Sequence, residues 1–243
     1  MKIAAIILSA GFGTRLAPLT DTTPKPLIEV GHKPVVTHLL ERLAAVTNLN
    51  EVVVVVNDQH PSLWQQWQAT IPPEPVVTVV SNGVVSEADR LGAVTDLATA
   101  VAAIDNADFI VVVAGDNLID ESLQAHVDAA IERNQPIVMC RDLGTEVPPG
   151  RFGEITIDDA GVVTRFREKP SHPESPLAAT CTYVLPGAVA NELAEYLVDG
   201  DADSPGSFIA WLAERTPVTA RPLQGRYFDI GNHETLAAAR SNW

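Results

Sequence analysis

The sequence of 243 residues predicts an α/β fold in three layers (α/β/α), with helices on both faces of a mostly parallel, mixed central sheet. Two observations lead to this prediction. Short apolar runs rich in β-branched residues recur without polar alternation, which is typical of strands buried on both faces of a parallel sheet. Segments with helical spacing of their apolar residues separate these runs, as in β-α-β units.

The first part of the chain carries this alternation. Its apolar runs predict strands at residues 3–8, 52–56, 76–80, 109–114 and 137–140. The segments between them predict helices at residues 34–46, 61–69, 92–104 and 121–133. Asp120 stands just before the last of these helices, where a short acceptor side chain favours an N-cap. We expect the run at 109–114 to be a central strand.

The pattern changes after about residue 145. Two strand-like segments, 152–157 and 162–167, flank Asp158-Asp-Ala-Gly161, whose residues favour a turn, so we expect a β-hairpin. Helices are expected at 188–198, at 208–214 and after His233. Because no repeat and no clear linker occurs, we expect a single domain, 1–243, with two halves at 1–145 and 146–243.

Composition narrows the class of function. The chain is 46% hydrophobic, which is enough to form a core and excludes intrinsic disorder. It has 16 Lys and Arg against 31 Asp and Glu, a formal charge of −15. Such a surface repels nucleic-acid phosphates and anionic lipid, so we expect neither nucleic acid nor a membrane as a partner. An anionic ligand therefore needs a local group of basic residues.

The two cysteines, Cys140 and Cys181, form neither a disulfide framework nor a metal-ligand spacing. The longest apolar runs have the length of strands rather than of membrane helices, and the first residues do not form a signal peptide. We therefore expect a cytoplasmic location.

A glycine-containing loop follows the first predicted strand. It reads Ser9-Ala-Gly-Phe-Gly-Thr-Arg-Leu16, and its glycines at 11 and 13 allow backbone N–H groups to approach a phosphate. Leu16 occupies the place of the third glycine of a dinucleotide fingerprint, and no Gly-Lys-Ser/Thr of a P-loop follows. The loop alone is a weak indication of phosphate binding.

Prolines make the next segment unusual. Pro18, Pro24 and Pro26 exclude a regular helix, so we expect the loop to run extended as far as Pro34. Such a loop can carry Arg15 and Lys25 to a nucleotide from two sides, the alternative being a surface loop with two solvated cations. The chain has only four lysines, and those at 25, 33 and 169 each precede a proline.

A family resemblance rests on these residues. The segment Leu8-Ser-Ala-Gly-Phe-Gly-Thr-Arg-Leu-Ala-Pro-Leu-Thr-Asp-Thr-Thr-Pro-Lys-Pro-Leu27 closely resembles the signature of the sugar-1-phosphate nucleotidyltransferases, also called nucleoside-diphosphate-sugar pyrophosphorylases. The resemblance continues, in the family's order, at Gly115-Asp-Asn117, Arg151-Phe-Gly-Glu154, Glu168-Lys-Pro170 and Phe228-Asp-Ile-Gly231. It implies a Rossmann-like nucleotidyltransferase fold in a short form without a C-terminal extension, with residues 1–145 as the nucleotide-binding half and residues 146–243 as the sugar-phosphate-binding half.

The resemblance also implies a reaction. An oxygen of a sugar 1-phosphate would attack the α-phosphorus of a nucleoside triphosphate, giving an NDP-sugar and pyrophosphate with Mg²⁺ as cofactor. The expected partners are these two substrates, and a homodimer is a candidate assembly. By the same resemblance Arg15 and Lys25 are the catalytic residues, and Asp116 and Asp229 are the metal ligands.

Further positions match the family's binding residues. For the nucleotide these are Ala10, Gly11, Gly13, Thr14, Arg15, Asn82 and Gly92, and for the sugar phosphate Gly153, Glu168, Lys169 and Thr180. Each has a simpler alternative: Glu168–Lys169 as an ordinary ion pair, Asp116 as a helix cap, Asp229 as a turn residue, and Asn82-Gly83 as a turn.

The identity of the substrates stays open. The loop at 81–92 lacks the family's usual sequence around Gly92, so Asn82 and Arg90 are only candidates for contacting the base. Thr180-Cys181 replaces the usual pair near the sugar. Two other functions also remain: a cytidylyltransferase for a phospho-alcohol such as phosphocholine, and a non-catalytic nucleotide-sugar sensor. Glu168-Lys169 and the motif at 228–231 favour a sugar acceptor over a phospho-alcohol.

Overall fold

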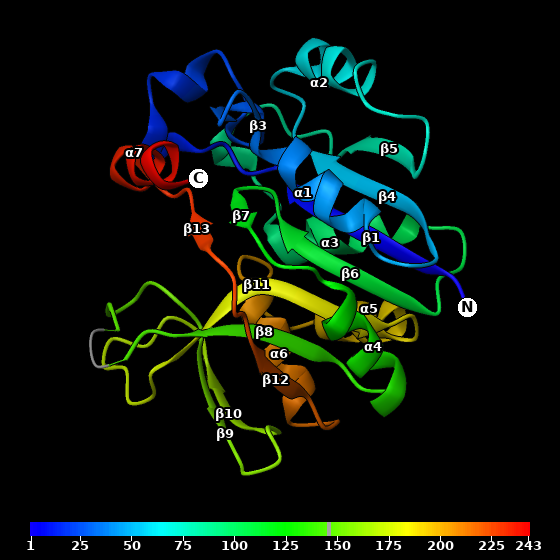
Figure 1. Ribbon diagram of the computed structural model, residues 1–243, viewed down its shortest axis with the longest axis vertical. Helices are drawn as coiled ribbons and strands as arrows, with labels where there is room; N and C mark the ends of the chain where they lie inside the picture. The colour runs from blue at the N-terminus through cyan, green and yellow to red at the C-terminus, as the bar shows by residue number, and fades with distance from the viewer. Residues whose placement is uncertain (145–146) are drawn as a thin grey trace.

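A computed structural model describes residues 1–144 and 147–243, without the side chains of residues 190 and 191 (Figure 1). The boundary that the sequence suggests between the two halves, at residues 145 and 146, lies outside the described residues.

A nine-stranded sheet forms the centre of the molecule. Its main path runs in the order β10-β9-β11-β6-β1-β4-β5. Four strands of this path are parallel: β1 (Ile3–Ser9), β4 (Leu49–Val56), β5 (Val76–Ser81) and β6 (Phe109–Ala114). The four corresponding predictions are confirmed, and β6 is central as expected. Both faces of β1, β4 and β6 are buried, which explains why their sequences do not alternate.

Antiparallel strands make the other part of the sheet. The predicted hairpin is confirmed as β9 (Glu154–Ile157) and β10 (Val163–Arg167), and the run at 137–140 forms β8 (Ile137–Asp142). The strand that joins the two parts, β11 (Leu177–Pro186), pairs antiparallel with β6, β8 and β9 and was not predicted. β12 (Thr219–Pro222) extends the sheet beside β8.

Helices cover both faces of the sheet, which confirms the three layers. On one face α1 (Val35–Ala44), α2 (Pro61–Gln68) and α4 (Gln124–Arg133) share one apolar core. On the other face α3 (Ala93–Ala102), α5 (Val189–Tyr196) and α6 (Pro205–Ala213) share a second core. Burying each large apolar side chain in these cores stabilises the fold by about 1.5–3 kcal/mol.

A small third core supports the loop that follows β1. It joins Leu16, Ile28 and Val30 to α7 (His233–Asn242) and to β7 (Asn117–Ile119). α7 confirms the helix expected after His233, and an Asn232–Thr235 capping box begins it. Figure 1 shows α7 lying beside this N-terminal loop, so the end of the chain packs against its beginning.

Two expectations are wrong in detail. Asp120 is not an N-cap, because α4 begins at Gln124; the Asp120 carboxylate instead accepts hydrogen bonds from Arg42 and Arg226. The loop after β1 does not run extended. It forms three short 3₁₀ turns at Thr14–Leu16, Leu19–Asp21 and Lys25–Leu27, and then the paired strands β2 (Glu29–Val30) and β3 (Lys33–Pro34). The fixed φ of proline excludes an α-helix but is compatible with these turns.

The first turn of α6 differs from the prediction, since the helix begins at Pro205 rather than at Phe208.

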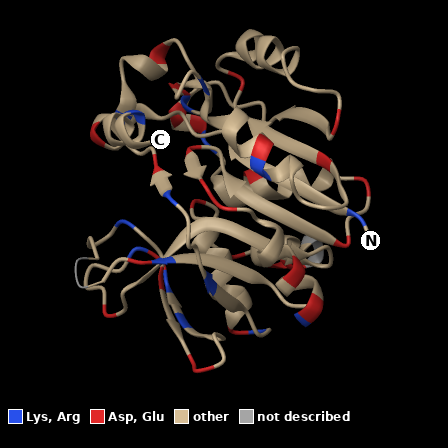
Figure 2. Ribbon diagram, in the orientation of Figure 1, with Lys and Arg blue, Asp and Glu red and all other residues tan. Residues whose placement is uncertain are grey.

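Figure 2 shows acidic residues on both parts of the ribbon and only scattered basic ones, in keeping with the net charge of −15. None of the helices in residues 1–144 and 147–243 has the length and apolar character needed to span a bilayer.

Candidate active site

A cavity of about 370 Å³ opens at the carboxyl ends of β1 and β6. Open α/β sheets bind their ligands at this edge. The cavity brings together residues from the glycine loop, from the start of α3, from the end of β6 and from the segment before α6. The predicted site residues on its wall are Ala10, Gly11, Gly13, Thr14, Arg15, Lys25, Gly92 and Asp116.

Gly13 holds the glycine loop against Lys25. Its φ is +66°, and a Cβ at this position would lie 3.0 Å from the Thr20 side chain and 3.1 Å from Lys25 Cβ. The Thr20 hydroxyl donates to the Gly13 carbonyl at 3.0 Å. Gly11 in contrast faces open space, so a side chain there would project into the free volume. The lack of a side chain therefore allows Gly13 to pack closely against Lys25, and it keeps the cavity free at Gly11.

Lys25 and Asp116 form an ion pair inside the cavity. Lys25 Nζ donates to Asp116 Oδ2 at 2.5 Å, and the lysine side chain is only 11% exposed. Strand β6 ends at Ala114, and Asp116 lies two residues later, after Gly115. The pair positions one cation and one carboxylate at the end of the central strand.

Asp229 comes to the same place through strand pairing. β13 (Tyr227–Asp229) lies antiparallel to β7, with Asp229 opposite Asn117, and Ile230 N–H donates to the Asp116 carbonyl at 3.0 Å. Burial and the charge of Asp116 raise the pKa of the Asp229 carboxyl, and Lys25, Arg151 and Arg15 oppose this shift. Two carboxylates therefore lie close enough to repel each other.

Such a pair fits a divalent cation. Mg²⁺ typically binds one or two carboxylates and completes its coordination with water and substrate phosphate oxygens. In the described part of the chain no group of three His, Cys, Asp or Glu side chains is placed to hold a metal. Asp116 and Asp229 therefore fit a cation that arrives with a phosphate ligand better than a closed structural site.

The arginines lie at the rim. Arg15 is exposed, and a Cβ on Gly231 would lie 3.5 Å from its Nη2 atom, so Arg15 and the segment after Asp229 are neighbours. Arg151 stacks over Phe152, with 5.0 Å from Cζ to the ring centre, and its Nη2 lies 3.9 Å from Asp229 Oδ2. Both guanidinium groups are thus close to the carboxylate pair.

The Glu168–Lys169 pair lies beside the cavity rather than in its wall. Lys169 Nζ donates to Ser204 Oγ at 2.8 Å and lies 3.3 Å from Glu168 Oε1. A Cβ on Gly153 would lie 3.0 Å from Glu168 Oε2. Ser204, which accepts from Lys169, is followed directly by Pro205, and Pro205 lies in the wall of the cavity.

Two predicted residues have internal roles in this structure. Thr180 is 3% exposed, and its hydroxyl donates to the Met139 carbonyl at 3.0 Å. Asn82 donates from Nδ2 to Asp96 at 2.7 Å and accepts the Val84 N–H at 3.0 Å. Within the described residues neither of the two belongs to the cavity wall, although Asn82 contacts a residue that does.

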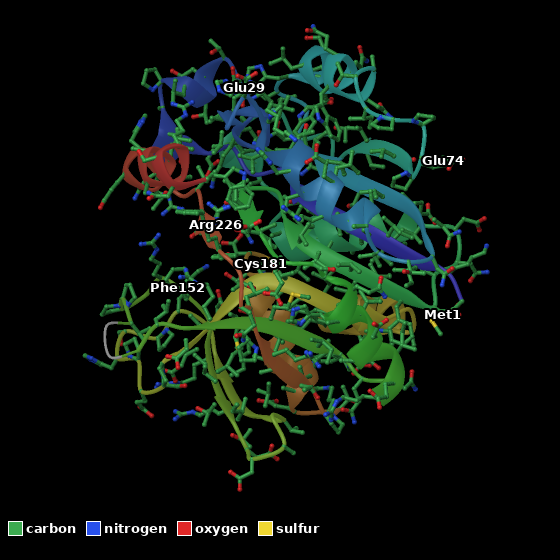
Figure 3. The ribbon with its side chains drawn as sticks, in the orientation of Figure 1. Met1, Glu29, Glu74, Phe152, Cys181 and Arg226 are labelled. Carbon is green, nitrogen blue, oxygen red and sulfur yellow. The ribbon has the colours of Figure 1, made fainter. Side chains whose placement is uncertain are left out.

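Several residues of the wall were not predicted to belong to the site, among them Asp96 and Asp203, and Cys181 was expected only as a neighbour of the sugar. Asp96 is the only charged residue of the helix Ala93–Ala102, which was an available signal. Cys181 has a φ of +49°, and Figure 3 shows it near the middle of the molecule, between the parallel strands and the hairpin. Its neighbourhood depends on the pairing of β11, which the sequence did not indicate.

Comparisons with known proteins agree with this geometry. The model of the nucleotidyl transferase family matches residues 4–243. The UTP–glucose-1-phosphate uridylyltransferase AglF of Haloferax volcanii is 29% identical over 232 residues, which are 95% of this chain and 92% of that protein. A glucose-1-phosphate thymidylyltransferase of Streptomyces antibioticus is 30% identical over 235 residues, covering 94% of this chain but only 62% of that protein.

A solved structure supports the fold as well. The crystal structure of a UDP-glucose pyrophosphorylase with UDP-glucose superposes with a TM-score of 0.82 at 20% identity, covering 99% of this chain and 98% of that one. The glycine loop, Lys25 and the two aspartates thus occur in a chain that matches one family model over nearly its whole length. The chain belongs to the nucleotidyl transferase family and is an enzyme of the sugar-1-phosphate nucleotidyltransferase type.

Proposed function

We propose that this chain transfers a nucleotidyl group from a nucleoside triphosphate to a sugar 1-phosphate in the presence of Mg²⁺, releasing pyrophosphate. The observation that carries the proposal is the ion pair of Lys25 and Asp116 between the glycine loop and Asp229. This arrangement offers backbone N–H groups, a cation and two carboxylates at one edge of the sheet. These groups suit two polyanions that must approach each other.

The bond changes need no nucleophile from the protein. A phosphate oxygen of the sugar 1-phosphate forms a new bond to the α-phosphorus, and the bond between the α-phosphorus and the bridging oxygen to the β-phosphate breaks. Pyrophosphate leaves with that electron pair. The protein must therefore align the two phosphates in line and neutralise the charge that develops between them.

On the nucleotide side, the phosphates would be aligned and neutralised mainly by three groups: the glycine loop, Arg15 and Lys25. Backbone N–H groups at Gly11 and Gly13 can approach the phosphates closely. Arg15 offers a forked set of donors that suits the departing β- and γ-phosphates, whereas Lys25 is a point charge. Because Asp116 and the packing against Gly13 hold Lys25 in place, its charge is oriented before the substrates bind.

Asp116 and Asp229 are the residues that would hold Mg²⁺. A metal ion held by these two carboxylates would supply positive charge against the negative charge of the substrate phosphates. Asp116 and Asp229 also repel each other, so a cation held between them would relieve this repulsion.

The acceptor would bind at the Glu168–Lys169 pair. The Lys169 side chain is 50% exposed and is oriented by Ser204, so its ammonium can donate further hydrogen bonds to a phosphate. Glu168 lies between Gly153 and Gly206, each of which leaves room for its carboxylate. A carboxylate beside the lysine suits the hydroxyl groups of a sugar, which are hydrogen-bond donors.

The test is pyrophosphate release over a grid of substrates. Five nucleoside triphosphates are combined with hexose 1-phosphates, heptose 1-phosphate and phosphocholine, with Mg²⁺ or with EDTA. We expect release for one or a few combinations with a sugar 1-phosphate, and none in EDTA. Release with CTP and phosphocholine alone would instead show the phospho-alcohol reaction. A blank grid with nucleotide-sugar binding in a thermal-shift assay would favour a sensor and contradict the proposal.

A further inference from the structure

Two parts of the cavity wall differ in chemistry. One part is the glycine loop with Arg15 and Lys25, which suit the phosphates of a nucleotide. The other part is the start of α3, where Gly92 and Asp96 lie in the wall. A nucleoside triphosphate is an elongated molecule with its base opposite the terminal phosphates. When the phosphates occupy the glycine loop, the base must contact another part of the wall, and we place it at the start of α3, called here the α3 end.

Asp96 is a buried acid at this end, with 8% exposure. Asn82 Nδ2 donates to Asp96 Oδ1 at 2.7 Å. The Asn82 oxygen accepts the Val84 N–H, so the amide is oriented with its donor toward Asp96. Across residues 1–144 and 147–243, Asp96 Oδ2 accepts no hydrogen bond and the carboxylate has no ion-pair partner. One oxygen of the acid thus has a protein partner and the other has none.

The Asp96 carboxylate destabilises the folded protein, because within the described residues only one of its oxygens accepts a hydrogen bond from a side chain. A buried carboxylate without a cation destabilises a protein unless other donors satisfy it. Burial raises the pKa of the Asp96 carboxyl, and the Asn82 hydrogen bond opposes this shift. The first turn of α3, in which Asp96 lies, favours a negative charge through the helix dipole. Because Asp96 lies in the cavity wall, this acceptor without a protein partner indicates a ligand that brings N–H donors.

The bases differ in the donors that they can offer to a carboxylate. Guanine presents two neighbouring donors, the ring N1–H and the 2-amino group. Uracil and thymine present N3–H between two carbonyl oxygens, whose lone pairs a carboxylate repels. Adenine and cytosine present an amino group beside a ring nitrogen that is an acceptor. Guanine alone matches both oxygens of a carboxylate, and a bidentate pair of this kind discriminates strongly against a wrong base.

We propose that Asp96 selects guanine, its carboxylate accepting hydrogen bonds from N1–H and the 2-amino group of GTP. Asn82 is a positioning residue that holds the carboxylate in the orientation for this contact. The inference rests on the proposed function, since it takes the cavity as the site of a nucleoside triphosphate. The two relatives described above are named for uridylyl and thymidylyl transfer, so the base varies within the family and follows from each chain's own residues.

The experiment measures binding and turnover separately on the full chain. Binding of GTP, UTP, dTTP, CTP and ATP with Mg²⁺ is measured by titration calorimetry without a sugar phosphate. We expect GTP to bind at least about tenfold more tightly than each of the others. The ratio of kcat/KM between GTP and UTP is then measured by pyrophosphate release with the acceptor that gives turnover. The wild-type order tests the proposal without any variant.

Asp96→Asn sharpens the test, because the amide keeps an oxygen for Asn82 and replaces the open oxygen with a donor. We expect the preference for GTP over UTP to fall by about 10- to 100-fold, with UTP and dTTP gaining from a hydrogen bond to their carbonyl groups. Asp89→Asn is the matched control. It removes the same charge from the exposed loop before α3, where Asp89 accepts only from Ser86 in the described residues, and it should leave the ratio unchanged.

The outcomes separate the two proposals. A wild-type protein that binds another base as tightly as GTP overturns the assignment of guanine. A folded Asp96→Asn protein with an unchanged GTP:UTP ratio does so too. Pyrophosphate release with UTP but not GTP contradicts this inference and leaves the proposed function intact. Selective GTP binding without turnover on any sugar 1-phosphate supports this inference and contradicts the proposed function.

Discussion

The proposed nucleotide side and the proposed acceptor side of the site are built by different means. On the nucleotide side the backbone conformation positions the groups. Gly13 has a φ of +66° and packs against Lys25, and Gly92 leaves room for the carbonyl of Ala202. On the acceptor side, which is the Glu168–Lys169 pair with residues 203–206, side-chain contacts hold the groups in place.

From this difference we expect the two sides to tolerate substitutions differently. A backbone conformation that only glycine adopts easily cannot be restored by a neighbouring side chain, whereas an exposed ion pair rearranges at little cost. Two contacts also join the sides. Val94 N–H donates to the Ala202 carbonyl at 2.8 Å, and Arg90 Nη2 lies 2.7 Å from Asp203 Oδ2. The start of α3 is thereby tied to the segment that orients Lys169.

Among the proposed substitutions, replacing Lys25 on the nucleotide side should cause the largest loss of turnover. Lys25→Ala removes the cation at the proposed reacting phosphates, so we expect turnover to fall by about 100- to 1,000-fold. Circular dichroism should show an intact fold. Lys33→Ala is the matched control, because Lys33 also precedes a proline but pairs with Glu41 at the surface. A near-normal rate for Lys25→Ala would remove the catalytic role proposed for it.

Replacing Gly92 tests the connection between the two sides. Its φ is +91°, and a Cβ would lie 2.3 Å from the Ala202 carbonyl oxygen. We expect Gly92→Ala to lower the free energy of unfolding by about 3 kcal/mol, measured by urea denaturation, because strain and a steric clash add. Gly83→Ala is the control: its φ is +76°, but a Cβ meets open space, so about 1 kcal/mol is expected. Equal losses would mean that the clash with Ala202 is relieved cheaply.

The ion pair of Glu154 with Arg167, which lies next in sequence to Gly153 and Glu168 of the acceptor side, gives a smaller effect. Glu154 is 3% exposed and accepts hydrogen bonds from Arg167 and from the backbone N–H groups of Glu174 and Ser175. Glu154→Gln weakens these bonds, so we expect a loss of about 2 kcal/mol in urea denaturation. Glu174→Gln, at an exposed partner of Arg167, should change stability by less than about 0.5 kcal/mol.

The effect of Glu154 should depend on pH. Burial alone would raise its pKa, but the two backbone donors and Arg167 reverse this and lower the pKa below the usual value near 4.5. A carboxyl with a lowered pKa in the folded state stabilises the protein above its unfolded pKa and loses this contribution as the pH falls through the folded pKa. The difference between wild type and Glu154→Gln should therefore be constant near neutral pH and narrow below about pH 4.5. A difference that widened in acid would contradict this.

Local sequence was sufficient for the strands of the parallel part. Residues 52–56 are valine at every position, and a run with no polar face predicts a strand covered on both sides. It was not sufficient for β11, whose segment Ala178-Ala-Thr-Cys-Thr182 mixes small and polar residues across an irregular register. Asp120 shows a similar limit: its type suits an N-cap, but Arg42 and Arg226, distant in sequence, engage its carboxylate.

The candidate site divides in the same way. Arg15, Lys25 and Asp116 stand in motifs that resemble those of the family, so the resemblance was sufficient to expect their grouping. The roles given to Asn82 and Thr180 stay predictions, and the structure shows hydrogen bonds inside the protein for both side chains. The position of Asp96 in the cavity wall could not be read from the sequence, because it depends on how α3 packs beside the glycine loop.

The sequence by itself determined the parallel strands, the glycine loop with its prolines, and the family to which the chain belongs. It did so because burial on both faces, backbone freedom and proline geometry are properties of neighbouring residues. Only the tertiary structure decided which distant groups meet. The pairing of β13 with β7 brings Asp229 to Asp116, and the packing of α3 against residues 202 and 203 accompanies the position of Asp96 in the cavity wall. These contacts join residues far apart in the chain, and no local pattern records them.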